Sequence, residues 1–156
     1  MSIKTGDQAP DFSLPKQDGT SVQLKDLLQK AAVVLYFYPK DDTPGCTKEA
    51  CSFRDSYEAF KDAGAEVVGI SSQSAASHEA FAAKYRLPFT LLADEGGTVR
   101  RQYGVPSTLG LLPGRVTYVI DRKGIVRHVF NSQLNATRHV TEALGIVKQL
   151  QGAGAA

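Results

Sequence analysis

Two cysteines, Cys46 and Cys51, are the residues of this chain whose positions point most directly to chemistry. Cys46 follows an apolar run, residues 33–38, that is typical of a buried strand because it is rich in β-branched and aromatic side chains and ends at a proline. Thr43-Pro44 then indicates a helix start, since threonine can cap a helix and proline is tolerated at the first helical position. Cys46 is therefore predicted to lie in the first turn of a helix that follows a strand.

A first-turn position favours a nucleophilic sulfur. An ordinary thiol is only a few per cent ionised at neutral pH, whereas free N–H groups and the positive end of a helix dipole stabilise the thiolate. The alternative is that Cys46 is a small buried side chain without chemistry, as most free cysteines are. The residues alone leave both interpretations open.

The predicted helix carries one apolar stripe that continues to about Gly64. Its members recur at spacings of four, three, four and three residues: Cys46, Ala50, Phe53, Tyr57 and Phe60. Cys46 stands at the N-terminal end of this stripe, so its sulfur is expected in a partly enclosed pocket. Cys51 is one position off the stripe.

The spacing of the two cysteines limits how they can react with each other. Residues five apart in an α-helix have Cα atoms about 8.6 Å apart, and a disulfide requires less than about 7 Å. Cys46 and Cys51 can therefore bond only if the helix partly unwinds, which suits a redox cycle better than a structural crosslink. Two unrelated buried thiols remain the alternative.

The composition is that of an ordinary globular domain. The chain has 156 residues, 42% of them hydrophobic and 22% charged, with a net charge of +2. It contains no basic cluster that would indicate nucleic acid, no signal peptide at its start and no run long enough for a membrane span. Two cysteines without a secretory signal favour a reducing compartment, so a cytoplasmic protein is expected, although a removed transit peptide would leave no trace.

Other candidate groups are weaker. The three histidines, His78, His128 and His139, are scattered, whereas zinc sites need clustered ligands, so no metal is expected. Asp41 and Asp42 are interpreted as solvated loop carboxylates.

The order of the predicted elements indicates the fold. The predicted elements are a hairpin of residues 11–14 and 21–24, a helical turn at 25–30, a strand at 33–38, the cysteine helix, a strand at 65–71, a helix ending near 85 with Ala76, Ala80, Phe81 and Tyr85 on its apolar side, a strand at 88–93, a short helix at 98–103, a long loop at 104–114, a hairpin of 116–120 and 125–130, a helix at 137–150 and a frayed tail at 151–156. This order predicts one α/β domain over residues 1–156, with a thioredoxin-like fold: a central mixed β-sheet flanked by helices and preceded by an N-terminal β-hairpin extension. Sites in such sheets lie at the carboxyl ends of strands, which is where Cys46 is predicted.

The residues around Cys46 resemble a known family. Pro39, Thr43 and Cys46 match the active-site signature of peroxiredoxins, and the run from Phe37 to Asp55 resembles the bacterioferritin comigratory protein, or peroxiredoxin Q, branch. The likeness covers nearly the whole chain, and a cysteine five positions after the first is specific to a subset of this branch.

The resemblance implies a thiol peroxidase without a bound cofactor. Cys46 would attack a hydroperoxide and become a sulfenic acid, Cys51 would resolve it to an intramolecular disulfide, and thioredoxin or a similar dithiol would reduce that disulfide. The monomeric state of many branch members is the expectation for this chain as well.

The resemblance also implies roles for other residues. Thr43 Oγ, the Cys46 N–H and Arg115 would stabilise the charge that develops at the O–O bond, and Pro39 would shield the thiolate. Glu49 would orient the arginine, and Phe89 would line the pocket. Without the resemblance, Arg115 cannot be chosen over Arg54, Arg86 or Arg122, and a helix cap is the commoner role for a threonine such as Thr43 before a proline.

Three other functions share parts of this pattern. A disulfide reductase of thioredoxin type needs Cys-x-x-Cys, and Cys46 to Cys51 is two residues too long. A metal carrier and a chaperone without chemistry are the other two; the first lacks clustered ligands, and the second would not need the intact motif.

Overall fold

The computed structural model describes residues 2–108 and 112–153, and its centre is a five-stranded mixed sheet. The strands lie in the order β5-β4-β3-β8-β9, with bounds Thr90–Ala93, Ala65–Ser71, Ala32–Phe37, Val116–Ile120 and Val126–Asn131. β3, β4 and β5 run parallel, whereas β8 is antiparallel to β3 and β9 is antiparallel to β8. This is the predicted mixed sheet.

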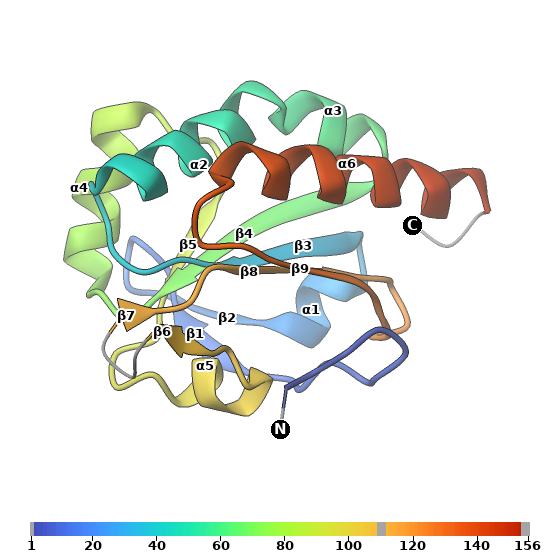
Figure 1. Cartoon of the computed structure of the whole chain (residues 1–156), viewed down its shortest axis with the longest axis horizontal. Helices are drawn as coiled ribbons and strands as arrows, with labels where there is room; N and C mark the ends of the chain where they lie inside the picture. The colour runs from blue at the N-terminus through green and yellow to red at the C-terminus, as the bar shows by residue number, and fades with distance from the viewer. Residues whose placement is uncertain (1, 109–111, 154–156) are drawn as a thin grey trace.

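Helices cover both faces of this sheet (Figure 1). One face packs against α2 (Pro44–Asp55), α3 (Tyr57–Asp62), α4 (Ala75–Tyr85) and α6 (Ala136–Gly152), and the other against α1 (Leu24–Leu28) and α5 (Thr98–Tyr103). β3 shows why: Val34 and Tyr36 point into the first core, whereas Leu35 and Phe37 point into the second. Side chains alternate across a strand, so a fully apolar strand is stable only when both of its faces are covered.

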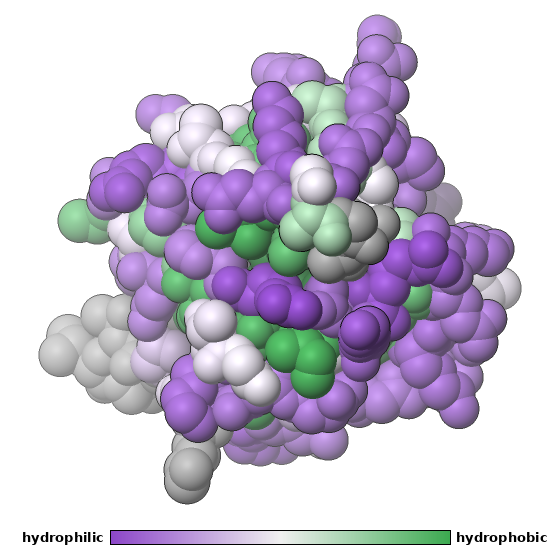
Figure 2. Space-filling model, turned by 90° about the vertical axis from the view of Figure 1, so that its right-hand side faces the viewer, coloured by the Kyte–Doolittle hydropathy of each residue, from purple (hydrophilic) through white to green (hydrophobic). Residues whose placement is uncertain are grey.

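The N-terminal region forms the predicted hairpin. β1 (Ser13–Pro15) pairs antiparallel with β2 (Ser21–Gln23), and α1 follows directly. Figure 2 shows the side of the molecule at the right of Figure 1, where α6 ends. Hydrophilic residues cover most of this face, and hydrophobic ones appear between them in small groups.

The apolar stripe that begins at Cys46 belongs to two helices, not one. The helix expected to continue to Gly64 breaks at Ser56, whose φ of −103° and ψ of 4° leave the helical region. Phe60 is still buried, but Tyr57 is only half-buried, and its hydroxyl donates to Glu66 Oε1 at 2.7 Å. A continuous periodicity in sequence does not reveal such a break, because both pieces keep their apolar side toward the sheet.

Several other boundaries and faces differ from the prediction. α4 does not turn Ala76 and Ala80 inward: both are exposed, and His78 and Phe81 are buried instead. The segment expected to be a loop contains two short paired strands, β6 (Ser107–Thr108) and β7 (Leu112–Pro113). α6 extends to Gly152, two residues beyond the predicted helix end at 150, and the end of the predicted tail lies outside the described residues.

Candidate active site

Cys46 lies in the first turn of α2, as predicted. β3 ends at Phe37, and Thr43 is the N-cap residue, with an extended backbone (φ −95°, ψ 156°). The first hydrogen bond of the helix runs from Thr47 N–H to Thr43 O at 2.8 Å, so the Cys46 N–H belongs to the turn whose N–H groups have no intrahelical acceptor. The sulfur is enclosed, since Cys46 is only 1% exposed.

Arg115 brings a positive charge to this sulfur. It precedes β8, and because Val116 pairs with Phe37, the start of β8 lies at the end of β3, close to α2. Arg115 Nη2 donates to Cys46 Sγ at 3.4 Å, and Nη1 donates to Glu49 Oε1 at 2.6 Å. The guanidinium is 5% exposed, so water screens its attraction for a thiolate only weakly.

Glu49 lies on the same face of α2 as Cys46, one turn later, and is completely buried. Burial raises the pKa of this carboxyl to about 8, and the opposing attraction of Arg115 does not restore its ordinary value. The 2.6 Å contact with Arg115 is nevertheless as short as a charge-assisted bond. Glu49 therefore fixes the guanidinium while its own charge depends on pH in the neutral to mildly alkaline range.

His139 of α6 closes the site behind Glu49. Its Nε2 lies 2.7 Å from Ser132 O, and a carbonyl can only accept, so Nε2 carries the proton and Nδ1 accepts from Thr117 Oγ1 at 2.8 Å. Burial lowers the pKa of His139 to about 4, and Arg115 also lowers it. The imidazole is thus neutral at pH 7 and stands 3.6 Å from Glu49 Oε2, an oxygen that has no hydrogen-bond partner in the described part of the chain.

A second arginine, Arg100, is buried beside the same strand end. It donates to Tyr38 O at 2.9 Å and to Gly114 O at 3.1 Å, and its guanidinium lies 5.8 Å from the centre of the Phe37 ring. Burial lowers the pKa of Arg100, and attraction to Asp94 and Cys46 opposes this effect. Arg100 thus ties the end of β3 to the residue before Arg115.

Sequence reasoning missed Arg100, His139 and Thr117. Only Arg100 could have been found from local sequence, because it lies on the side of the short helix α5 that is expected to be buried. His139 and Thr117 become part of the site only because α6 packs against β8.

Three residues predicted for the site, Thr43, Pro39 and Phe89, form no hydrogen bond to the sulfur in the described part of the chain. Thr43 Oγ1 donates to Lys40 O at 3.0 Å and makes no side-chain cap, so its hydroxyl closes the loop that precedes α2. Pro39 is half-buried in the same loop. Phe89 packs in an aromatic cluster, with its ring centre 6.0 Å from that of Tyr36 and 6.3 Å from that of Phe53. The structure therefore joins Cys46, Glu49 and Arg115, and places the other three around them.

Cys51 also lies in α2, and both cysteines carry free thiols. Cys51 is half-buried, and its charge would attract the neighbouring Arg54. Because one uninterrupted helix contains both residues, the separation of about 8.6 Å between their Cα atoms applies, and a direct disulfide requires local unwinding.

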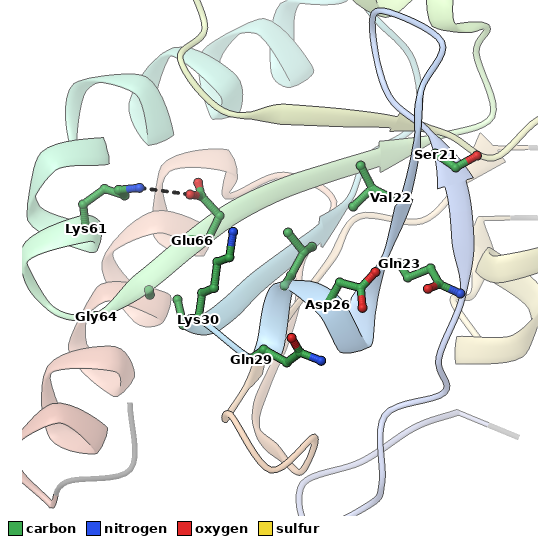
Figure 3. A pocket seen from close by; sticks show the side chains of 12 residues that line it. Ser21, Val22, Gln23, Asp26, Gln29, Lys30, Lys61, Gly64 and Glu66 are labelled. Carbon is green, nitrogen blue, oxygen red and sulfur yellow. Dashed lines mark hydrogen bonds and ion pairs between the residues drawn. The ribbon is translucent and has the colours of Figure 1, made fainter.

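A large surface hollow lies at the other end of the sheet. It has a volume of about 640 Å³ and is lined by β2, α1 and the turn between α3 and β4, including Lys30, Lys61 and Glu66 (Figure 3). Cys46 follows the end of β3, whereas this hollow lies at its start, about 20 Å away along six residues of strand. The hollow is therefore separate from the cysteine site.

Known proteins are similar to this chain in sequence and in fold. A model described as the AhpC/TSA family matches residues 5–129. The chain belongs to the AhpC/TSA family. Within it, a chloroplastic peroxiredoxin Q of Triticum aestivum is 58% identical over 149 residues, which are 95% of this chain and 68% of that protein. A chloroplastic peroxiredoxin Q of Sedum lineare is 55% identical over 150 residues, 96% of this chain and 80% of the relative.

Solved structures agree with this AhpC/TSA assignment. The peroxidoxin BcpB of Mycobacterium tuberculosis superposes with a TM-score of 0.89 and is 42% identical, over 95% of this chain and 98% of that one. A peroxiredoxin Q of Xanthomonas campestris has a TM-score of 0.82 and 30% identity, over 90% and 91% of the two chains. The chain is thus an AhpC/TSA protein of the peroxiredoxin Q branch, an atypical 2-Cys peroxiredoxin with the predicted thioredoxin-like fold, and it is a thiol-dependent peroxidase.

Proposed function

We propose that Cys46 is the peroxidatic residue of this peroxidase. Its thiolate attacks the terminal oxygen of a hydroperoxide, the O–O bond breaks, and the sulfur is oxidised to a sulfenic acid. The departing oxygen takes a proton from water and leaves as an alcohol, or as water when the substrate is hydrogen peroxide. The observation that carries this proposal is the buried Arg115 Nη2 that donates to Cys46 Sγ at 3.4 Å in the first turn of a helix.

The surrounding groups supply charge in the right place. Negative charge spreads from sulfur to both peroxide oxygens as the bond breaks, and fixed donors stabilise it most when water is excluded. Arg115 and the Cys46 N–H are such donors, and Glu49 holds the guanidinium through its 2.6 Å contact. In this proposal, Thr43 and Pro39 shape the loop that covers the sulfur. Phe89 supports the aromatic core behind the sulfur.

Cys51 is the proposed resolving residue. Its sulfur attacks the sulfenic sulfur of Cys46, a disulfide forms, and one water leaves. A dithiol of the thioredoxin type then transfers two electrons and two protons, which restores both thiols. The free, half-buried state of Cys51 in the same helix supports this step, because only the turns between the two cysteines have to rearrange.

The proposed substrates are hydrogen peroxide and organic hydroperoxides. One similar structure, the bacterioferritin comigratory protein of Xanthomonas campestris, is described by its alkyl peroxide reduction activity, and it is 27% identical to this chain. We further propose that the enzyme acts as a monomer. Its compartment is reducing, and the names of the plant relatives favour a plastid over the cytoplasm expected from the sequence. In the described residues, no helix combines the length and apolarity needed to cross a bilayer.

Peroxide consumption tests the assignment of the two cysteines. Wild-type protein with thioredoxin, its reductase and NADPH should consume hydrogen peroxide continuously, and Cys46→Ser should consume none above background. Circular dichroism of the variant controls for folding. Peroxide consumption by Cys46→Ser at the wild-type rate would exclude Cys46 as the reacting residue.

A further inference from the structure

Two adjacent aspartates tie the loop before α2 to α4. Asp42, which directly precedes the N-cap residue, accepts from Lys84 Nζ and from Tyr85 Oη, each at 2.7 Å. These contacts join residues more than 40 positions apart in sequence, and they lie at the surface. α4 therefore holds the loop that leads into α2.

Asp41 makes a second, buried attachment to the same helix. One oxygen accepts from Tyr38 Oη at 2.6 Å, and the other lies 2.7 Å from both Ser77 Oγ and His78 Nδ1. Burial raises the pKa of Asp41, but its hydrogen bonds, led by that from His78, outweigh this effect and lower it. The prediction from sequence that both aspartates are solvated is thus wrong for Asp41, which is 7% exposed.

The loop conformation itself depends on these contacts. Asp42 has a φ of +57°, in the left-handed region that residues other than glycine seldom adopt. Such a conformation persists only where neighbouring groups hold it. Loss of the contacts would let Asp42 relax, and the first turn of α2, which starts two residues later, would lose its fixed starting point.

The far end of α2 is attached to α4 as well. Arg54 Nη1 donates to Tyr85 O at 2.8 Å, three residues after Cys51. Both cysteines therefore lie between two attachments to one helix. The turns of α2 that must unwind for a disulfide therefore lie between the attachment at Asp42 and the attachment at Arg54.

We propose that α4 is a clamp on the peroxidatic helix, with Asp41 and Asp42 as positioning residues that set how readily its first turns unwind. This inference rests on the proposed function, since it concerns the step from Cys46 sulfenic acid to the disulfide. A tight clamp keeps the sulfenic acid in its pocket, where a second peroxide oxidises it to the sulfinic acid. A weaker clamp lets Cys51 reach the sulfur sooner.

Asp42→Asn and Lys84→Met test the clamp with little risk to folding, because both residues are exposed. Asparagine tolerates the left-handed backbone and keeps the shape of the side chain, so this variant removes the charge without adding strain. Lys61→Met is the matched control, since Lys61 also forms an exposed ion pair, with Glu66 at 3.2 Å beside the remote hollow (Figure 3). The double variant of Asp42 and Lys84 measures whether the two residues act together.

The main measurement is the fate of the sulfenic acid. The chain has no tryptophan, so rapid quenching, thiol alkylation and mass spectrometry follow each species. Each single variant should form the disulfide roughly threefold faster, as expected for loss of one exposed charged contact, with a matching fall in sulfinic acid at high peroxide. The rate constant of Cys46 with peroxide should change much less, and the double variant should add little to either single variant. If Asp42 and Lys84 had only a general structural role, the variants would instead lower thermal stability without changing the ratio of disulfide to sulfinic acid.

Hydrogen exchange of the reduced protein tests the clamp independently of activity. Amides of residues 46–51 should exchange faster in Asp42→Asn and Lys84→Met, whereas those of α6 and all amides of Lys61→Met should match the wild type. Wild-type exchange at residues 46–51 in both variants, with an unchanged ratio of disulfide to sulfinic acid, would overturn the clamp. If the wild type consumed no peroxide, the proposed function would fail, and the exchange data would still decide the clamp.

Discussion

Replacing Gly45 by alanine tests whether the close approach of Arg115 to Cys46 matters for catalysis. Gly45 precedes Cys46 in the first turn of α2, and a Cβ there would lie 3.0 Å from Arg115 Nη2. Ordinary contacts begin near 3.4 Å, so the guanidinium would have to withdraw by about 0.4 Å. Withdrawal directly away from the helix would lengthen its 3.4 Å bond to the sulfur to nearly the limit of a hydrogen bond to sulfur.

The expected loss of activity follows from the weakened hydrogen bond between Arg115 and the Cys46 sulfur. A hydrogen bond to a charged group contributes about 1.5–3 kcal/mol. Loss of roughly half of it would weaken the stabilisation of the reacting sulfur by about 1 kcal/mol, which lowers the rate constant about fivefold. Alanine is better than glycine within a helix by up to about 1 kcal/mol, so the free energy of unfolding should not fall. Activity and stability should therefore change in opposite directions.

Single-turnover oxidation measured by quenching and mass spectrometry gives the rate constant, and urea titration gives the free energy of unfolding. Gly145→Ala is the control, because Gly145 is a helical glycine of α6 with no atom within 4 Å of an added Cβ. It should gain similar stability and keep the wild-type rate constant. A Gly45→Ala protein that reacts with peroxide as fast as the wild type would refute the reasoning.

Three further predictions concern the same site. Arg115→Lys keeps the charge but loses the fork that bonds Cys46 and Glu49 together, so single-turnover oxidation should be roughly tenfold slower or more; an unchanged rate constant would contradict this. The raised pKa of Glu49 means that the stability it contributes is full below its ordinary value of 4.5 and is lost as the pH rises through about 8. Urea titrations should therefore show that the free energy of unfolding of Glu49→Gln rises relative to that of the wild type, by roughly 1 kcal/mol per pH unit between pH 5 and 7. A difference between the two proteins that stays constant with pH would argue against a raised pKa of Glu49. Cys51→Ser should reduce one equivalent of peroxide and then stall or become over-oxidised at Cys46, and continuous turnover with thioredoxin would show that Cys51 is dispensable.

Local signals in the sequence determined the helix that carries both cysteines. The apolar strand, the Thr43-Pro44 start and the spacing of the cysteines are properties of consecutive residues, and each follows from rules about caps, strands and helix geometry. They placed Cys46 in the first turn of α2 and Cys51 in the same helix, as the structure has them. The order of strands and helices likewise gave the mixed sheet, because few topologies satisfy it.

Only the tertiary structure decided which distant residues meet the sulfur. Arg115 is 69 positions from Cys46, and residue type alone does not separate it from the other arginines; the pairing of β8 with β3 does. Asp41 was misjudged for the same reason, since a loop aspartate is normally solvated and becomes buried here only because α4 packs over it and His78 bonds to it. Helix caps and apolar periodicity depend on neighbouring residues, so the sequence shows them directly. The charged groups near the sulfur come from distant segments, and only the folded sheet and the helices packed on it bring those segments together.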